Sequence, residues 1–113
     1  MNTEMGKKLE ESLETISQGC FQKMGEFVIG GLKNGRLEVN GYLPYNTISE
    51  IPKATIQKEL QIIKEKFSLL MNQSQIFKDY ALNVGIDYYL VLDTGNAGIA
   101  ICSEIEGVYK EFI

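Results

Sequence analysis

The sequence predicts one α+β domain over residues 1–113, in which helices pack against an antiparallel sheet of about five strands. The first observation is that apolar positions in two stretches are three or four residues apart, as in amphipathic helices. The second is an alternation of apolar and polar residues elsewhere, with turn residues between the runs, as in strands and hairpins. The third is a length of 113 residues with 44% apolar content, enough for one core. The expected order of elements is α-ββ-α-βββ.

The first helix is predicted from a stripe of apolar residues: Met5, Leu9, Leu13, Ile16 and Cys20. Asn2 or Thr3 is placed to cap its start. Gly19 is expected to end it, because glycine tolerates the left-handed conformation found after helix C-termini. Phe21 and Met24 could also extend the stripe, so the C-terminal boundary stays open.

A hairpin is predicted from residues 26–32 and 37–43, joined by Asn34-Gly35, since this dipeptide suits a type I′ turn. This register places one set of side chains on the face toward the helices: Val28, Leu32, Leu37, Val39 and Leu43. The opposite face receives Phe27, Ile29, Glu38, Asn40 and Tyr42. Gly30-Gly31 precedes no helix and no Gly-Lys-Ser/Thr, so we expect these glycines to let an aromatic ring or a helix approach the sheet.

The second helical stretch begins near Ser49-Glu50-Ile51-Pro52, which offers a capping residue and a proline for the first turn. Its core stripe is Ile56, Leu60, Ile63, Phe67 and Leu70. One helix from Ile48 to Asn83 would be roughly 50 Å long, more than the expected body of the domain. We therefore expect a break at Asn72-Gln73-Ser74, three poor helix formers.

The closing strands begin at Ile86, where the period becomes two. One side of this strand carries Ile86, Tyr88, Leu90 and Leu92, and the other carries Asp87, Tyr89, Val91 and Asp93. Residues 93–98 are a turn by composition, and residues 99–103 form the next strand. Glu106-Gly107 then turns into a last strand over residues 108–112.

The charge balance excludes several classes of function. The chain has 11 basic and 15 acidic residues and a net charge of −4, the wrong sign for a nucleic-acid binder. No apolar run approaches the ~20 residues of a membrane span, and no signal-peptide pattern precedes the first helix, so a cytoplasmic protein is expected. Cys20 and Cys102 are then interpreted as core side chains. The abundance of lysine, isoleucine and asparagine fits an AT-rich microbial genome.

Catalytic and metal sites are not expected. The chain has no histidine, so a serine or cysteine nucleophile has no imidazole to activate it, and zinc or calcium spacing is absent. Glu10, Glu11 and Glu14 are interpreted as a solvated helix face. We therefore predict a non-enzymatic protein without a cofactor.

One motif points to a catalytic function instead. Asp93-Thr94-Gly95, after an apolar run, resembles the active-site signature of aspartic proteases, in which two aspartates share a proton. Asn96 departs from that signature, and the residues after Gly95 are too few for the elements that the family places there. The interpretation as a hairpin turn is preferred. Cleavage of unfolded peptides at acid pH, abolished by Asp93→Asn, would support the protease instead.

A second apolar stripe accompanies the core stripe of the long helical region. It consists of Ile62, Leu69, Ile76 and Tyr80, about 120° from the core stripe if the helix is projected at ~100° per residue. Either the helix breaks and the later residues fold into the core, or the stripe is a subunit interface.

The element order resembles that of the Roadblock/dynein light chain family, with its profilin-like fold. The similar elements are the opening helix 10–17, the hairpin at Asn34-Gly35, the helix from Pro52 and the closing strands 88–112. The resemblance implies a homodimer joined through the second helix and an adjacent edge strand. Such a dimer acts without catalysis as a platform for small Ras-like GTPases or a larger complex. No position matches a defined GTPase-contact motif, so no contact residue is inferred.

A second class of function fits the size and acidity equally well. A small acidic inhibitor, an immunity protein that binds a toxin, or a secretion chaperone would bind one basic partner through a charged surface. A salt-insensitive homodimer favours the platform. A monomer whose partner binding falls steeply with salt favours the inhibitor.

Overall fold

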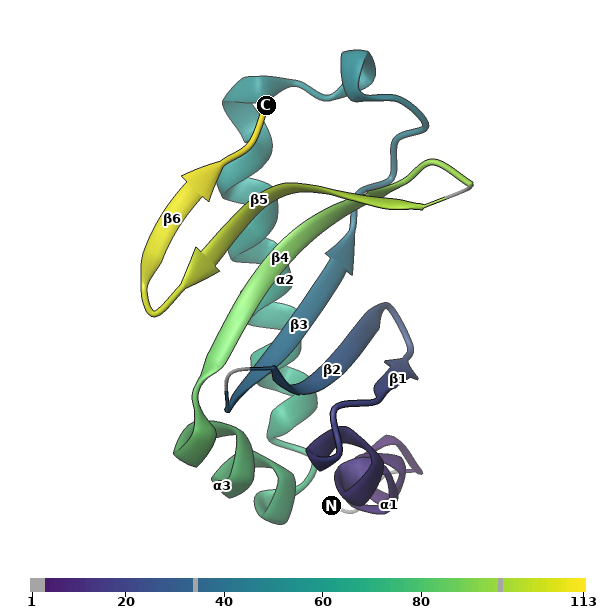
Figure 1. The fold of residues 1–113 in the computed structure, drawn as a ribbon, viewed down its shortest axis with the longest axis vertical. Coiled ribbons are helices and arrows are strands. Elements are labelled where there is room, and N and C mark those ends of the chain that lie inside the picture. Colours follow the sequence, from purple (N-terminus) through teal and green to yellow (C-terminus); the bar gives the residue numbers. More distant parts are fainter. Residues whose placement is uncertain (1–3, 34, 96) are drawn as a thin grey trace.

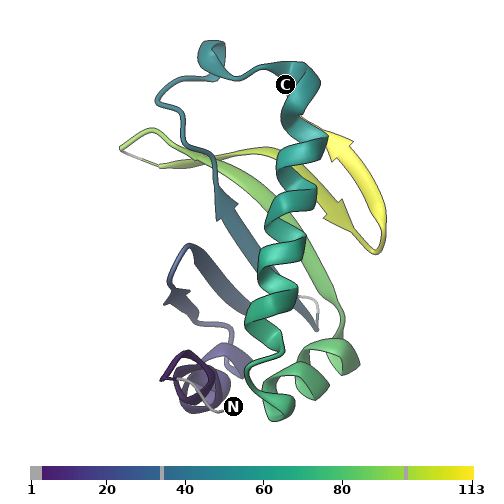
Figure 2. The same cartoon turned by 180° about the vertical axis from the view of Figure 1, so that it is seen from behind.

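The chain folds into a two-layer α+β domain with three helices on one face of a six-stranded sheet (Figures 1 and 2). The computed structural model describes residues 4–33, 35–95 and 97–113. The helices are α1 (Glu4–Ser17), α2 (Ile56–Met71) and α3 (Gln75–Val84). The strands are β1 (Phe21–Met24), β2 (Phe27–Lys33), β3 (Arg36–Tyr42), β4 (Ile86–Asp93), β5 (Gly98–Ile105) and β6 (Val108–Glu111).

The strands lie in the sheet in the same order as in the chain. Neighbours are antiparallel except β3 and β4, which are parallel because α2 and α3 connect them across one face. The sheet differs from the predicted antiparallel sheet of about five strands in two details: β1 adds a sixth strand, and one pair is parallel. The α+β class and the predicted order of the other elements are confirmed, with the second helical region divided into α2 and α3.

The missed strand β1 follows from the way α1 ends. Gly19 has φ of +85°, and the N–H groups of Gly19 and Cys20 donate to the carbonyls of Ile16 and Thr15 at 2.9 and 3.2 Å. These two bonds form a Schellman motif and stop the helix, as Gly19 predicted. The chain then turns away, which leaves Cys20 exposed rather than buried. The predicted caps Asn2 and Thr3 lie outside the described residues.

The hairpin of β2 and β3 has a different register from the predicted one. Phe27 pairs with Gly41 and Ile29 with Val39, and an irregularity between Gly30 and Lys33 shifts the register by one residue. A shift of one residue exchanges the two faces of a strand. Phe27 and Ile29 are therefore buried in the core, whereas Val28 faces away from the helices, opposite to the prediction. Asn34, half of the predicted turn, lies outside the described residues.

The second helical region starts later than predicted and breaks where predicted. Two short 3₁₀ turns cover Ile48–Glu50 and Lys53–Thr55, and α2 begins only at Ile56. The Glu50 carboxylate accepts the N–H of Thr47 at 2.9 Å and so closes the first of these turns before Pro52. The break lies at residues 72–74, where the Ser74 hydroxyl accepts the N–H of Phe77 at 3.1 Å and caps α3. The helical region is thus two helices.

The core lies between the sheet and the helices. The predicted core residues of α2 are all buried: Ile56, Leu60, Ile63, Phe67 and Leu70. The Phe67 ring meets the rings of Phe27, Phe77 and Tyr88 edge-on, with centroids 5.6, 6.2 and 6.1 Å away. This aromatic cluster joins α2 and α3 to β2 and β4.

Two adjacent glycines of β2 confirm the expected close approaches. A Cβ at Gly31 would lie 1.3 Å from the Ile16 carbonyl oxygen, so α1 rests directly on this strand. A Cβ at Gly30 would lie 2.5 Å from the Phe21 ring, so the ring lies across the opposite face. One glycine admits a helix and the other admits an aromatic ring.

Candidate functional site

The candidate site is the face of the sheet that no described helix covers, which we call the outer face. In Figure 1 the sheet lies in front of α2, and the view from behind in Figure 2 shows α2 running along the other side. The outer face includes one row of paired residues across all six strands: Lys23, Val28, Asn40, Tyr89, Ser103 and Lys110. The next row toward the top of Figure 1 holds Tyr42, Val91 and Ala100.

Aromatic side chains occupy much of this face. Phe21 is 63% exposed and Tyr42 is 43% exposed, and the half-buried Tyr89 lies on the central strand β4. All three rings line a hollow of about 410 Å³ together with Val28, Val91 and Ala100. Apolar and aromatic groups in a shallow concave surface are typical of protein-binding sites.

A polar cluster adjoins the rings at the lower end of the face. Glu38 pairs with Asp87 across β3 and β4, so their side chains are neighbours on the outer face. The guanidinium of Arg36 donates to Asp87 from both Nε and Nη2 at 2.9 Å, and the Glu106 N–H donates to the same oxygen at 3.2 Å. The hydrogen bond that Arg36 donates to Asp87, although partly offset by desolvation, holds the pKa of Arg36 above its ordinary value. Asp87 is therefore already paired.

Glu38 differs from Asp87 in this respect. Within the described parts of the chain, no side chain forms a hydrogen bond or an ion pair with the Glu38 carboxylate. Its oxygen Oε2 would lie 3.0 Å from a Cβ at Gly30, where the Phe21 ring also lies. Burial, then the negative charges of Glu38 and Asp87, raise the pKa of Tyr89. Glu38 is thus an unpaired carboxylate flanked by two aromatic rings.

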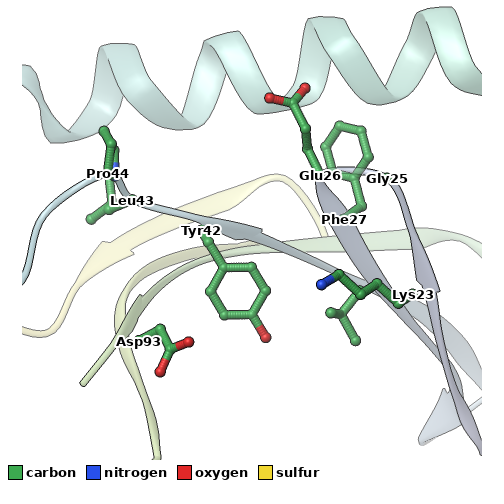
Figure 3. A pocket seen from close by; sticks show the side chains of 9 residues that line it. Lys23, Gly25, Glu26, Phe27, Tyr42, Leu43, Pro44 and Asp93 are labelled. Atoms are coloured by element: carbon green, nitrogen blue, oxygen red, sulfur yellow. The ribbon is translucent and has the colours of Figure 1, made fainter. Parts of the chain in front are cut away.

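A second hollow of about 590 Å³ continues the first, since both are lined by Val28 and Tyr42. It lies at the β1–β2 turn and the start of β2, beside the C-terminal end of β3. Figure 3 shows the Tyr42 ring between Asp93 and Lys23 in this view, with Leu43 and Pro44 on the β3 side. The two hollows adjoin at Val28 and Tyr42, and we call them together the groove.

Asp93 lies at the rim of this groove, within the predicted hairpin turn. Asp93 pairs with Gly98 at the ends of β4 and β5, which confirms the turn. Its carboxylate accepts the N–H of Gly95 at 2.9 Å, and the Thr94 hydroxyl donates to the Ala97 carbonyl at 2.9 Å. Both side chains are exposed and hold the turn together. This geometry supports the turn interpretation over a protease site.

The four residues of the second stripe do not share one helical face, because the helix breaks between Leu69 and Ile76. Leu69 is 69% exposed and Ile76 is 59% exposed, whereas Ile62 and Tyr80 are half-buried. Leu69 lines a hollow of about 360 Å³ between α1, the β1–β2 turn and α2. The Tyr80 hydroxyl is buried and has no hydrogen-bond partner among the described residues. Whether these residues form a subunit interface stays a prediction.

Other groups of chemical interest are dispersed. In the described ranges, no three His, Cys, Asp or Glu side chains converge on a possible metal position. Burial raises the pKa of the Cys102 thiol to about 11, so it carries almost no thiolate at neutral pH. Glu10, Glu11 and Glu14 are exposed as predicted, and Glu10 accepts a hydrogen bond from Ser74 at 3.0 Å. No helix in the part of the chain that the structure describes is long and apolar enough to cross a membrane.

Sequence reasoning found part of the outer face. It placed Glu38, Asn40 and Tyr42 together on one face of the hairpin. It placed Tyr89 on the side of β4 that also carries Asp87. It missed Phe21 and Val28 because the strand β1 and the shifted register were not visible. No protein-family model, curated protein or solved structure matches this chain.

Proposed function

We propose that this protein is a non-catalytic binding module that docks a partner protein on its outer face. The observation that carries the proposal is the sheet face that no described helix covers, on which three aromatic rings line one hollow. Exposed aromatic and apolar side chains on a rigid sheet bury large areas at little cost in conformational entropy. The absence of histidine and the raised pKa of Cys102 support binding over catalysis.

Tyr42→Ser tests the proposal, because it removes an exposed ring that both hollows share. The partner is first captured from a lysate of the source organism, identified and purified, and its affinity is then measured by calorimetry. We expect Tyr42→Ser to weaken binding by about tenfold or more, as truncation of a central aromatic anchor does. Stability should change little, since Tyr42 is 43% exposed.

Ile48→Ser is the matched control. Ile48 is 42% exposed, almost the same as Tyr42, but it lies in a 3₁₀ turn beyond the end of β3. The control variant should bind the purified partner as tightly as the wild type. Equal affinities of the Tyr42→Ser and wild-type proteins would contradict docking on the outer face.

We further propose, from the sequence, that the module is a cytoplasmic homodimer joined through the side of α2 that carries Leu69. Its exposure of 69% supports this part of the proposal, because an exposed leucine in a hollow is a candidate for burial by a second copy. The partner would then be a small GTPase or a larger complex, as the resemblance to the Roadblock family implies.

Leu69→Glu distinguishes a role of Leu69 in a subunit interface from a role in the stability of the fold. We expect a folded monomer by light scattering and circular dichroism, because the new charge opposes association while leaving the core intact. Leu82→Glu, at a position 60% exposed on α3 and outside the stripe, should leave the dimer unchanged. A wild-type protein that is already monomeric would remove the dimer from the proposal.

The acidic inhibitor is the second candidate, and the unpaired carboxylate of Glu38 favours it. Binding of a basic partner through this carboxylate should weaken as salt rises. A salt titration of the same purified complex therefore distinguishes it from a platform that binds through apolar contacts.

A further inference from the structure

We propose that the partner anchors itself on the outer face by an arginine side chain, which pairs with Glu38 between the rings of Phe21 and Tyr89. This inference rests on the proposed function and names the chemistry that the outer face recognises. It commits to a basic partner protein rather than to a second copy of this chain.

The charge of Glu38 favours a cation from the partner. Arg36, two residues away on the same strand, is held by Asp87 at 2.9 Å and so is not available to Glu38. The central strands β3 and β4 carry Glu38, Asp87 and Asp93 on this face against the single cation Arg36. A cation brought by the partner would neutralise the Glu38 carboxylate, which has no side-chain hydrogen bond or ion pair within the described ranges.

The rings beside Glu38 favour a guanidinium as this cation. The Phe21 ring and the Glu38 carboxylate both lie over Gly30, and Tyr89 lines the same hollow from β4. A guanidinium can pack against the faces or edges of such rings while it donates two parallel hydrogen bonds to a carboxylate. The ammonium group of lysine is not planar, so it cannot stack on a ring and donate two parallel hydrogen bonds at the same time. The arrangement therefore favours arginine over lysine.

The position of Glu38 argues against a second copy as the occupant. Two-fold packing of one sheet face on the same face brings the central strands of both copies together. The carboxylates of Glu38 and Asp93 would then face carboxylates of the other copy, which is unfavourable. The lysines of the face, Lys23 and Lys110, lie far from this centre on β1 and β6.

The test uses N-acetyl-arginine methylamide as the probe and the ¹⁵N-labelled full chain as the receptor. Amide shifts should move in a saturable way around residues 30, 38 and 89 and little elsewhere. Glu38→Gln should weaken this binding about fivefold or more, because it removes the charge and keeps the shape. Glu65→Gln, which removes an exposed carboxylate of α2, should leave it unchanged.

Several results would overturn the inference: no local shifts, shifts that survive Glu38→Gln, or equal binding of the lysine or leucine methylamides. The proposed function is judged separately, by the effect of Tyr42→Ser on the purified partner. If Tyr42→Ser weakens binding of the partner but the arginine probe does not bind, the outer face docks its partner by apolar contacts alone. If Tyr42→Ser leaves the affinity for the partner unchanged, docking on the outer face is refuted, whatever the probe shows.

Discussion

Replacing Gly31 with alanine should destabilise the fold by more than about 4 kcal/mol, at the upper end of single-residue effects. The added methyl would lie 1.3 Å from the Ile16 carbonyl oxygen and 2.2 Å from its carbon. These are backbone atoms of α1, so relief requires the helix to move off the sheet, which would open the core around Ile16. Urea unfolding followed by circular dichroism measures the change in the free energy of unfolding.

Gly30→Ala is the matched comparison, one residue away on the same strand. Its methyl would meet the Phe21 ring at 2.5 Å, a side chain that is 63% exposed and free to rotate outward. We expect a loss of about 1 kcal/mol, within the usual range of surface and strand substitutions. Similar losses for the two variants would show that α1 is not seated on Gly31 as described.

Phe67→Ala should cost about 3 to 5 kcal/mol of stability, the range for truncation of a buried phenylalanine. Phe67 has no exposed surface, and its ring meets three other rings edge-on. The cavity would lie between α2, α3 and the sheet, so both helices would lose packing. The same urea titration gives the value.

Phe112→Ala provides the control for loss of an aromatic side chain. Phe112 is 46% exposed near the C-terminus, where its ring lies 5.6 Å from the Lys110 ammonium. Its removal should change the free energy of unfolding by less than about 1 kcal/mol. A small effect at Phe67 as well would contradict the aromatic cluster as the centre of the core.

Strong periodicity made most of the fold predictable from the sequence. The stripe of α2 and the alternation of β4 repeat over enough residues to determine both element type and buried face. The break at Ser74 was predictable because three weak helix formers occur at the point where a longer helix would exceed the length of the domain. These features depend on local chemistry that is visible in the residues themselves.

The outer face was only partly predictable, for two physical reasons. The four residues of β1 are too few to show a period, and Phe21 and Met24 also fit the stripe of the preceding helix. The irregularity in β2 lies between Gly30 and Lys33, where Gly31 contacts α1, and no local pattern in the sequence reveals this contact. The shifted register places Val28 outward and Phe27 inward, and so determines which side chains the outer face presents.

The short outermost strands have a consequence for how this protein behaves at high concentration. β1 and β6 each pair on one side only, span four residues and carry an exposed lysine, Lys23 or Lys110. Short charged edges resist the addition of further strands from other chains. The sheet should therefore not extend into fibrils or swapped ladders, even though its broad side is rich in aromatic groups. Crowding in a cell would then favour lateral docking over polymer growth.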